Sequence, residues 1–234
     1  MRVRKLKLYH YPAVRSARVK WLLHELVGDD FELEVVDLYE GEQYSPRYLD
    51  INPNHGVPAL EVVTEDGRST RMLESGAMVV LLADSFPEKG LAPPPDGFSP
   101  ERADYLQAIH FCGAAMDMML WQIRIHEHVL SDRERDDRTI QRYRNKFAGE
   151  VEPQLKRRLE VGGFACGGRF SAADCVIGHG VMWAQAYGLC TDPVFADYIA
   201  LMSQRPAFQS TFADLVGFTL EVPRGAPVVE LFTG

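Results

Sequence analysis

The chain has 234 residues, of which 46% are hydrophobic and 25% are charged, and its formal net charge is −8. This composition predicts a soluble protein of two domains and argues against a nucleic-acid binder, because phosphate contacts require a clustered basic face. No apolar run approaches the ~20 residues of a membrane-spanning helix, and the first residues lack a secretory signal, so we expect a cytoplasmic protein without a membrane partner.

The first 86 residues alternate short strands with helices. Residues 5–9 read as a strand, 16–26 as a helix with one apolar face, and 31–38 as a second strand. After a polar loop, 58–64 and 69–73 flank the turn Glu-Asp-Gly-Arg and read as a hairpin. A helix follows over 76–82. This order predicts a small sheet with a parallel first unit and an antiparallel second unit, covered by helices.

The second part of the chain reads as helical. The stretch LAPPPDGFSP cannot continue a helix. We therefore expect domain 1–86, a linker at 87–98 and an all-helical domain at 99–234. Apolar residues recur at helical spacing over 105–120 and 140–159, with a kink or boundary at Pro153. Further helices are predicted over 170–188, over 193–201 and after Arg-Pro-Ala-Phe, and the tail EVPRGAPVVELFTG either covers a pocket or lies on the surface.

The cysteines and histidines indicate no metal or dithiol site. The four cysteines form no C-x-x-C pair, so buried reduced thiols in a reducing compartment are expected. His126 and His128 are two residues apart, which on a helix points them to different faces. We therefore predict no metal. The cysteines are Cys112, Cys166, Cys175 and Cys190.

Two short motifs point to a ligand in the first domain. Val57-Pro58 stands at the entry to a strand, where proline is tolerated. A cis bond there would turn backbone groups toward an extended peptide ligand, whereas a trans bond merely begins the strand. Glu74 and Ser75 precede a helix, so Ser75 reads as an N-cap beside an anion site, and Glu74 suits an ammonium. The pair fits the two charged ends of an α-amino acid, although a plain cap without a ligand is the better explanation for an isolated Glu-Ser pair.

The stretch FSAAD, residues 170–174, has the form of a capping box. Ser171 and Asp174 have the Ser-x-x-Asp spacing ahead of an apolar run, and Phe170 is placed as the hydrophobic staple. This motif is predicted to be structural.

Taken in order, these motifs resemble those of the cytosolic glutathione transferases, from Leu6 to about Ala213. The resemblance implies a thioredoxin-like first domain with the order β-α-β-α-β-β-α, followed by an all-α helical bundle. It implies glutathione as co-substrate, a cis Val57-Pro58 bond, a hydrophobic electrophilic small molecule as second substrate, a role in detoxification and a homodimer.

The resemblance also assigns binding residues. Val57 pairs through its backbone with the cysteinyl part of glutathione, and Pro58 holds that geometry. Glu74 and Ser75 take the γ-glutamyl end. His55 falls where a side chain often reaches the glycyl carboxylate, although this chain has His-Gly where the pattern usually has Gly followed by Lys or Gln.

The catalytic position departs from the family pattern. A Ser, Tyr or Cys in the first loop usually stabilises the thiolate, which is the nucleophilic form of a thiol. Here Ala13, Val14 or Arg15 aligns with that position, Ser16 follows and Tyr11 precedes. Ser16 either contacts the sulfur or caps the helix, Arg15 is either a cationic substitute or solvated, and Tyr11 either donates a hydrogen bond or lines the pocket. The first N–H groups of the helix are a further candidate.

Three functions are compatible with these residues. The first is a glutathione S-transferase whose electrophile pocket is lined by Phe111, Met116, Met119 and Trp121, although these methionines also fit a core. The second is a glutathione-dependent reductase or lyase, which tends to use a cysteine in the first loop, and this chain has none before Cys112. The third is a non-catalytic relative that serves as a binding module.

Overall fold

A four-stranded sheet with the strand order β2-β1-β3-β4 organises the first part of the protein. The computed structural model describes residues 3–215. Strand β1 (Val3–His10) pairs in parallel with β2 (Glu32–Val35), and β3 (Ala59–Thr64) pairs antiparallel with both β1 and β4 (Ser69–Met72). The prediction of a parallel first unit and an antiparallel hairpin is therefore confirmed.

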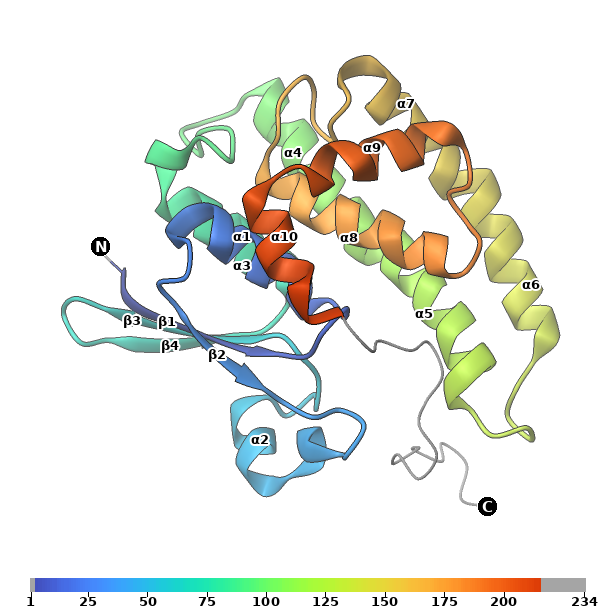
Figure 1. Ribbon diagram of the computed structural model, residues 1–234, viewed down its shortest axis with the longest axis horizontal. Helices are drawn as coiled ribbons and strands as arrows, with labels where there is room; N and C mark the ends of the chain where they lie inside the picture. Colours follow the sequence, from blue (N-terminus) through green and yellow to red (C-terminus); the bar gives the residue numbers. More distant parts are fainter. Residues whose placement is uncertain (1–2, 216–234) are drawn as a thin grey trace.

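Helices cover both faces of this sheet. Figure 1 shows α1 (Ser16–Val27) and α3 (Ser75–Ser85) on one side, facing the C-terminal helices, and α2 (Pro46–Ile51) on the other. The predicted apolar face of α1 is buried in the main core, which is continuous across both parts of the molecule. A second, smaller core under α2 contains Tyr9 and Tyr48, whose ring centres lie 5.8 Å apart.

The segment between β2 and β3 is more ordered than the polar loop that the hydropathy pattern predicts. It contains a 3₁₀ turn (Glu42–Tyr44) and α2. Ser45 caps α2 by accepting from the Tyr48 N–H at 3.3 Å, and Pro46 occupies the first turn. Six residues are too few for a helical period to show, so the sequence pattern missed this helix, although the thioredoxin-like order includes one.

The C-terminal part consists of helices joined by short connections. The helix that begins with α4 (Pro100–Phe111) continues through a π-helical turn (Cys112–Asp117) into α5 (Met118–Arg124) and a second such turn (Ile125–Val129). The remaining elements are a 3₁₀ turn (Pro87–Lys89), α6 (Asp137–Lys146), a π-helical turn (Phe147–Val151), α7 (Glu152–Gly162), α8 (Ala172–Ala186), α9 (Pro193–Ser203), α10 (Pro206–Phe212) and a final 3₁₀ turn (Ala213–Leu215).

Pro153 lies at the start of α7, directly after the π-helical turn. The backbone stays helical from that turn into α7, and Pro153 lies in the first turn of α7, where a residue without an N–H is tolerated. Within residues 3–215, no helix is both long and apolar enough to span a bilayer. The tail 221–234, for which two placements were predicted, lies outside the described residues.

Helix α8 is the centre of the C-terminal part and contacts α1, α3, α4 and α9. Its capping box is present as predicted: the Ser171 N–H donates to Asp174 Oδ2 at 2.8 Å. Asp174 Oδ1 also accepts from the Ala165 N–H at 2.7 Å and from the Tyr198 hydroxyl at 2.9 Å. Phe170 packs against Trp21 of α1, with 5.8 Å between ring centres, so the cap also joins α8 to the first part of the chain.

Candidate functional site

The candidate site lies along one edge of the sheet. The strand register places His10 opposite Val35, Tyr9 opposite Ala59, and Leu60 opposite Met72. The connections that follow β1, β2 and β4, and the one that precedes β3, therefore leave the sheet at the same edge. This topology brings three predicted segments together: 11–16, 55–58 and 74–75.

The backbone of these three segments is strained. Among the described residues, four that are not glycine have positive φ, and three of them belong to these segments: Ala13 at 63°, His55 at 42° and Glu74 at 72°. The fourth is Cys190. A residue with a Cβ pays a free-energy cost in this region, and such strain concentrates at functional sites. The sheet edge therefore has the backbone features of a binding site.

Hydrogen bonds from α2 and from the residue directly after it hold the loop before β3. The Gly56 carbonyl accepts hydrogen bonds from the Tyr48 hydroxyl at 2.7 Å and from Asn52 Nδ2 at 2.6 Å. The Val57–Pro58 peptide bond that follows is cis. His55 is exposed, and its ring centre lies 5.0 Å from that of Tyr44. Sequence pattern does not identify Tyr48 and Asn52 as part of the site, because only the fold brings α2 and the residue after it next to this loop.

The start of α3 differs by one residue from the prediction. Glu74 occupies the N-cap position and Ser75 is the first helical residue, so Ser75 is not the N-cap. The positive φ of Glu74 places the turn into the helix at that residue. Ser75 is buried and Glu74 is exposed. Among the described residues, no side chain caps the first N–H groups of α3, which leaves these donors available for a carboxylate.

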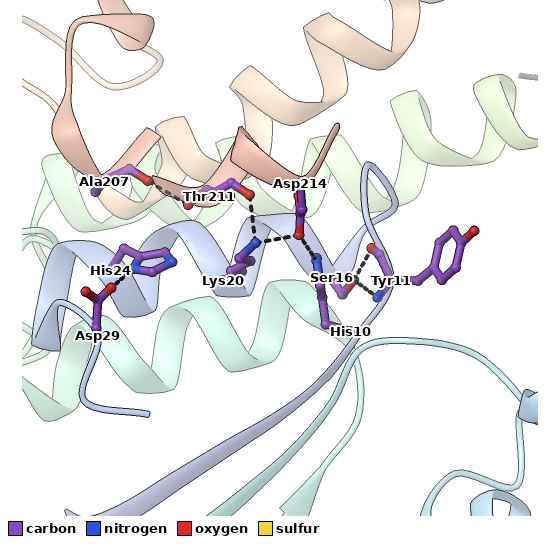
Figure 2. Close-up of polar contacts among 9 residues, drawn as sticks. All are labelled: His10, Tyr11, Ser16, Lys20, His24, Asp29, Ala207, Thr211 and Asp214. Atoms are coloured by element: carbon purple, nitrogen blue, oxygen red, sulfur yellow. Dashed lines mark hydrogen bonds and ion pairs between the residues drawn. The ribbon is translucent and has the colours of Figure 1, made fainter. Parts of the chain in front are cut away.

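The Ser16 side chain contacts Tyr11 of the loop after β1 and His10 at the end of that strand (Figure 2). Its Oγ lies 3.2 Å from the Tyr11 N–H, from which it accepts, 3.1 Å from the Tyr11 carbonyl and 2.8 Å from His10 Nδ1. The hydroxyl has one proton, which goes either to the carbonyl or to the imidazole. Ser16 is completely buried. Its hydroxyl is thus engaged within the protein in either arrangement.

The contacts of His10 continue to the C-terminal end of the described chain. His10 Nε2 lies 3.1 Å from Asp214 Oδ2, and Lys20 Nζ donates to the same oxygen at 2.6 Å and to the Thr211 carbonyl at 2.9 Å. Burial opposes ionisation of Asp214, but the hydrogen bonds from His10 and Lys20 outweigh it and lower its pKa to about 2. An ionised Asp214 only accepts, so Nε2 of His10 carries a proton. Sequence reasoning missed His10 and Asp214, which are 204 residues apart.

Arg15 and Tyr11 are the predicted catalytic residues that reach the outside of the loop. Arg15 is exposed, and its guanidinium carbon lies 6.0 Å from the centre of the Trp121 ring of α5. The Tyr11 ring meets Tyr39 edge-on, with centres 5.4 Å apart. Burial, together with the nearby Tyr39 and Asp37, raises the pKa of Tyr11 to about 12. The phenol therefore stays protonated at neutral pH and can only serve as a hydrogen-bonding or wall group.

The four predicted pocket residues divide into two groups. Met116 and Met119 lie in the main core, with exposed fractions of 0% and 3%. Phe111 is partly buried against the core, and Trp121 is 39% exposed. Of the four, Trp121 is the side chain that both reaches solvent and faces the β1–α1 loop.

The cysteines have the environment of core thiols. All four are free, and Cys112, Cys175 and Cys190 are buried as predicted, whereas Cys166 is half-buried. Burial raises the pKa of each of these thiols, that of Cys166 to about 12. They are therefore poor nucleophiles at neutral pH. Over the described part of the chain, no group of three or more His, Cys, Asp or Glu side chains is arranged to hold a metal ion.

Comparison with known proteins adds independent information. Residues 4–79 match the family described as Glutathione S-transferase, N-terminal domain. Glutathione S-transferase 1 of Dianthus caryophyllus is 38% identical over 93 residues, which are 38% of this chain and 38% of that protein. This chain spans about two fifths of the length of the first curated relatives that it matches.

Two further relatives match over most of their length. The disulfide-bond oxidoreductase YfcG of Escherichia coli is 28% identical over 211 residues, which are 86% of this chain and 92% of that protein. The crystal structure of a glutathione transferase from Methylococcus capsulatus superposes with a TM-score of 0.74 at 28% identity, covering 89% of this chain and 97% of that one. The similarity thus extends across both parts of the fold.

Proposed function

We propose that this chain, which belongs to the glutathione S-transferase family, binds glutathione at the sheet edge and promotes attack of the glutathione thiolate on a hydrophobic electrophile. One observation carries the proposal: Ala13, His55 and Glu74 adopt strained backbone conformations at one edge of the sheet, inside the matched region 4–79. Unfavourable backbone conformations of this kind persist only where the surrounding structure holds them in place, and they cluster at active sites and ligand-binding sites.

The peptide part of glutathione is assigned to the two segments on the β3 and β4 side. Val57 offers its backbone N–H and C=O to the cysteinyl part, with Pro58 holding that turn. Glu74 takes the γ-glutamyl ammonium, and Ser75 with the uncapped start of α3 takes its carboxylate. His55 is exposed at the same edge and is assigned to the glycyl carboxylate.

The thiolate is assigned to the loop between β1 and α1. A free thiol has a pKa of ~8.5, so a nearby positive charge or donor raises the reactive fraction at neutral pH. Arg15 is exposed at the start of α1. The first N–H groups of this helix are weaker candidates, because the Ala17 and Arg18 N–H groups already donate to the Val14 and Arg15 carbonyls at 2.8 and 3.3 Å. Tyr11 is a protonated donor in the same loop. Ser16 is a weaker candidate than Arg15, because its hydroxyl is already engaged by Tyr11 and His10.

The electrophile is assigned to the space between this loop and α5. Trp121 offers a partly exposed aromatic face 6.0 Å from the Arg15 guanidinium carbon, and Phe111 adds apolar surface. Met116 and Met119 support these residues from the core. An aromatic face with one cation beside it favours planar, electron-poor electrophiles.

The domain limits and assembly belong to the same proposal. We assign glutathione binding to 1–86, a linker to 87–98 and the helical domain to 99–234, which is supported by the end of α3 at Ser85 and the start of α4 at Pro100. A cytoplasmic homodimer that handles toxic electrophiles is the arrangement that the family resemblance favours. Light scattering of the purified chain tests the subunit number.

Retention on immobilised glutathione and conjugation of a generic aryl halide test the function. We expect wild-type protein to be retained and to accelerate conjugation. Glu74→Ala should lose retention, whereas Glu65→Ala should behave as wild type, because Glu65 lies in the turn after β3 at the opposite edge of the sheet. Equal retention of both variants would remove glutathione from the proposal.

A second candidate function is a glutathione-dependent disulfide reductase. It is favoured by the 28% identity to the oxidoreductase of Escherichia coli over 92% of that protein's length. The discriminating assay compares the rate of mixed-disulfide reduction by glutathione with the rate of aryl halide conjugation. Retention on glutathione with neither rate above the uncatalysed reaction would instead support a non-catalytic binding module.

A further inference from the structure

A buried polar network lies beneath the β1–α1 loop, between the two parts of the molecule. It consists of Arg18 from α1, Asp117 from the π-helical turn after α4, and His179 from α8, with exposed fractions of 1%, 6% and 3%. Arg18 Nη1 and Nη2 donate to the two Asp117 carboxylate oxygens, each at 2.7 Å. Arg18 Nε donates to His179 Nδ1 at 3.1 Å. One arginine thus connects all three elements.

This arrangement determines which nitrogen of His179 carries the proton. An arginine side chain only donates, so Nδ1 of His179 accepts from it and is unprotonated. Nε2 therefore carries the proton and donates to the Ala13 carbonyl, 3.0 Å away. Burial and the charge of Arg18 lower the pKa of His179 to about 3, so the imidazole is neutral at physiological pH.

The residue that His179 contacts is the strained one in the loop. Ala13 has φ of 63°, in the left-handed region where the Cβ of an L-residue crowds a backbone oxygen. Its carbonyl accepts a hydrogen bond from His179, while the Ser16 hydroxyl accepts one from the Tyr11 N–H. The loop is therefore fixed from α8 on one side and from the start of α1 on the other. Arg15 follows Ala13 by two residues.

Two glycines allow His179 to come this close. A Cβ on Gly178 would lie 3.2 Å from Cζ3 of Trp21 in α1, and a Cβ on Gly180 would lie 2.7 Å from Cε of Met116. A side chain at 178 would press against the buried Trp21 ring, whereas the terminal methyl of Met116 would have to move aside for a side chain at 180. The glycines on either side of His179 thus allow α8 to pack closely on Trp21 of α1 and on Met116.

We propose that His179 is a positioning residue for the reaction assigned above: by holding the Ala13 carbonyl it sets the direction of the loop, and thereby the placement of Arg15 at the glutathione sulfur. The Arg18–Asp117 pair acts one step further away by fixing the His179 tautomer. This inference rests on the proposed function, because it requires a bound thiolate to be stabilised by this loop.

The test compares two substitutions at the same position. His179→Phe removes both hydrogen bonds, whereas the amide of His179→Gln retains one acceptor for Arg18 and one donor for Ala13. The exposed His110 of α4 offers a matched control in His110→Gln. For each protein, the ultraviolet absorbance of the thiolate is titrated to obtain the pKa of bound glutathione, and glutathione affinity is measured by calorimetry.

We expect His179→Phe to raise the pKa of the bound thiol by about one unit, and to lower kcat about tenfold below that pKa, since one unit is a tenfold change in thiolate fraction. Glutathione affinity should change less than about threefold, because the contacts of the γ-glutamyl and cysteinyl parts stay in place. In His179→Gln the pKa of the bound thiol should lie close to the wild-type value, and in His110→Gln it should equal that value.

The outcomes separate the two proposals. A wild-type chain that does not lower the pKa of bound glutathione overturns the proposed function and this inference together. A wild-type chain that lowers it, with His179→Phe equal to wild type or His179→Gln no better than His179→Phe, overturns the positioning role alone. If His179→Phe does not fold, ¹⁵N spectra of the wild-type histidine rings replace it. The His179 Nε2–H signal should then shift on addition of glutathione, and an unchanged signal overturns the role.

Discussion

Arg18 and Asp117 form a two-point ion pair in the interior, with both nitrogen–oxygen distances at 2.7 Å. The pair joins the first helix of the sheet-containing part to the helical part. Removing one partner leaves an uncompensated buried charge, which typically costs about 3–5 kcal/mol, whereas replacing both by apolar residues costs much less. The pair is therefore expected to behave as a unit.

We predict that Asp117→Asn lowers the free energy of unfolding by about 3 kcal/mol, because the Arg18 charge loses its counter-ion in a desolvated position. The double variant Arg18→Met, Asp117→Asn should lose less free energy of unfolding than the two single variants lose together. Urea denaturation of the four proteins gives this coupling directly. Strictly additive losses would show that the pair is not coupled.

The pH dependence of stability should contain a contribution from His179. Its pKa is about 3 in the folded chain against 6.5 for an ordinary histidine, so the unfolded chain binds the extra proton between these values. The free energy of unfolding should therefore fall as pH decreases from 6.5 toward 3, by up to about 1.4 kcal/mol per pH unit from this group. His179→Gln should fall less steeply in urea denaturation at pH 7.5, 6 and 5. Parallel curves for the two proteins would contradict the assignment, and His110→Gln should parallel the wild type.

Asp214 should hold the end of the described chain against α1. Its pKa of about 2 lies below the ordinary value of 3.8, so its stabilising effect is complete above the ordinary value and is lost as pH falls toward 2. We expect Asp214→Asn at neutral pH to accelerate amide hydrogen exchange in α10, because the hydrogen bonds from Lys20 and His10 to the carboxylate weaken. Asp197→Asn, at an exposed position of α9, is the control and should leave exchange in α10 unchanged. Equal exchange in both variants would exclude this anchoring role.

Gly162 at the end of α7 should not accept a side chain. A Cβ there would lie 2.2 Å from the backbone oxygen of Gly167, which cannot move aside as a flexible side chain would. Gly162→Ala should lower the free energy of unfolding by about 2 kcal/mol or more, and Gly168→Ala, where no atom lies within 4 Å of the added Cβ, by about 0.5 kcal/mol or less. Thermal unfolding of both variants measures the difference, and equal losses would refute the predicted clash.

The capping box should affect stability and leave ligand binding unchanged. Ser171→Ala should cost about 0.5–2 kcal/mol, because the start of α8 loses a capping group. Glutathione affinity, measured on the folded variant, should equal that of the wild type, since the α8 residue that contacts the β1–α1 loop is His179 and not Ser171. A selective loss of affinity would mean that α8 transmits a change to the site.

The sequence determined the features that depend on neighbours along the chain. The hairpin follows from its turn residues, the position of Pro153 in the first turn of α7 from a missing N–H, and the capping box at Ser171 from the spacing of two polar side chains. The order and spacing of Val57-Pro58 and Glu74-Ser75 mark them as candidate ligand-binding residues, and both can be read from the sequence without knowledge of the fold. The hydropathy pattern does not predict α2, because a segment of six residues is too short to show a helical period.

Only the tertiary structure decided what surrounds the β1–α1 loop. The pattern of residues 11–16 allowed Ser16 to face either a ligand or the interior, and the contacts with His10 and Tyr11 turn it inward. His179 reaches the Ala13 carbonyl across 166 positions of sequence. Such contacts leave no local pattern, because a buried polar group must find a hydrogen-bonding partner to offset its loss of hydration, and the fold alone determines which groups become neighbours.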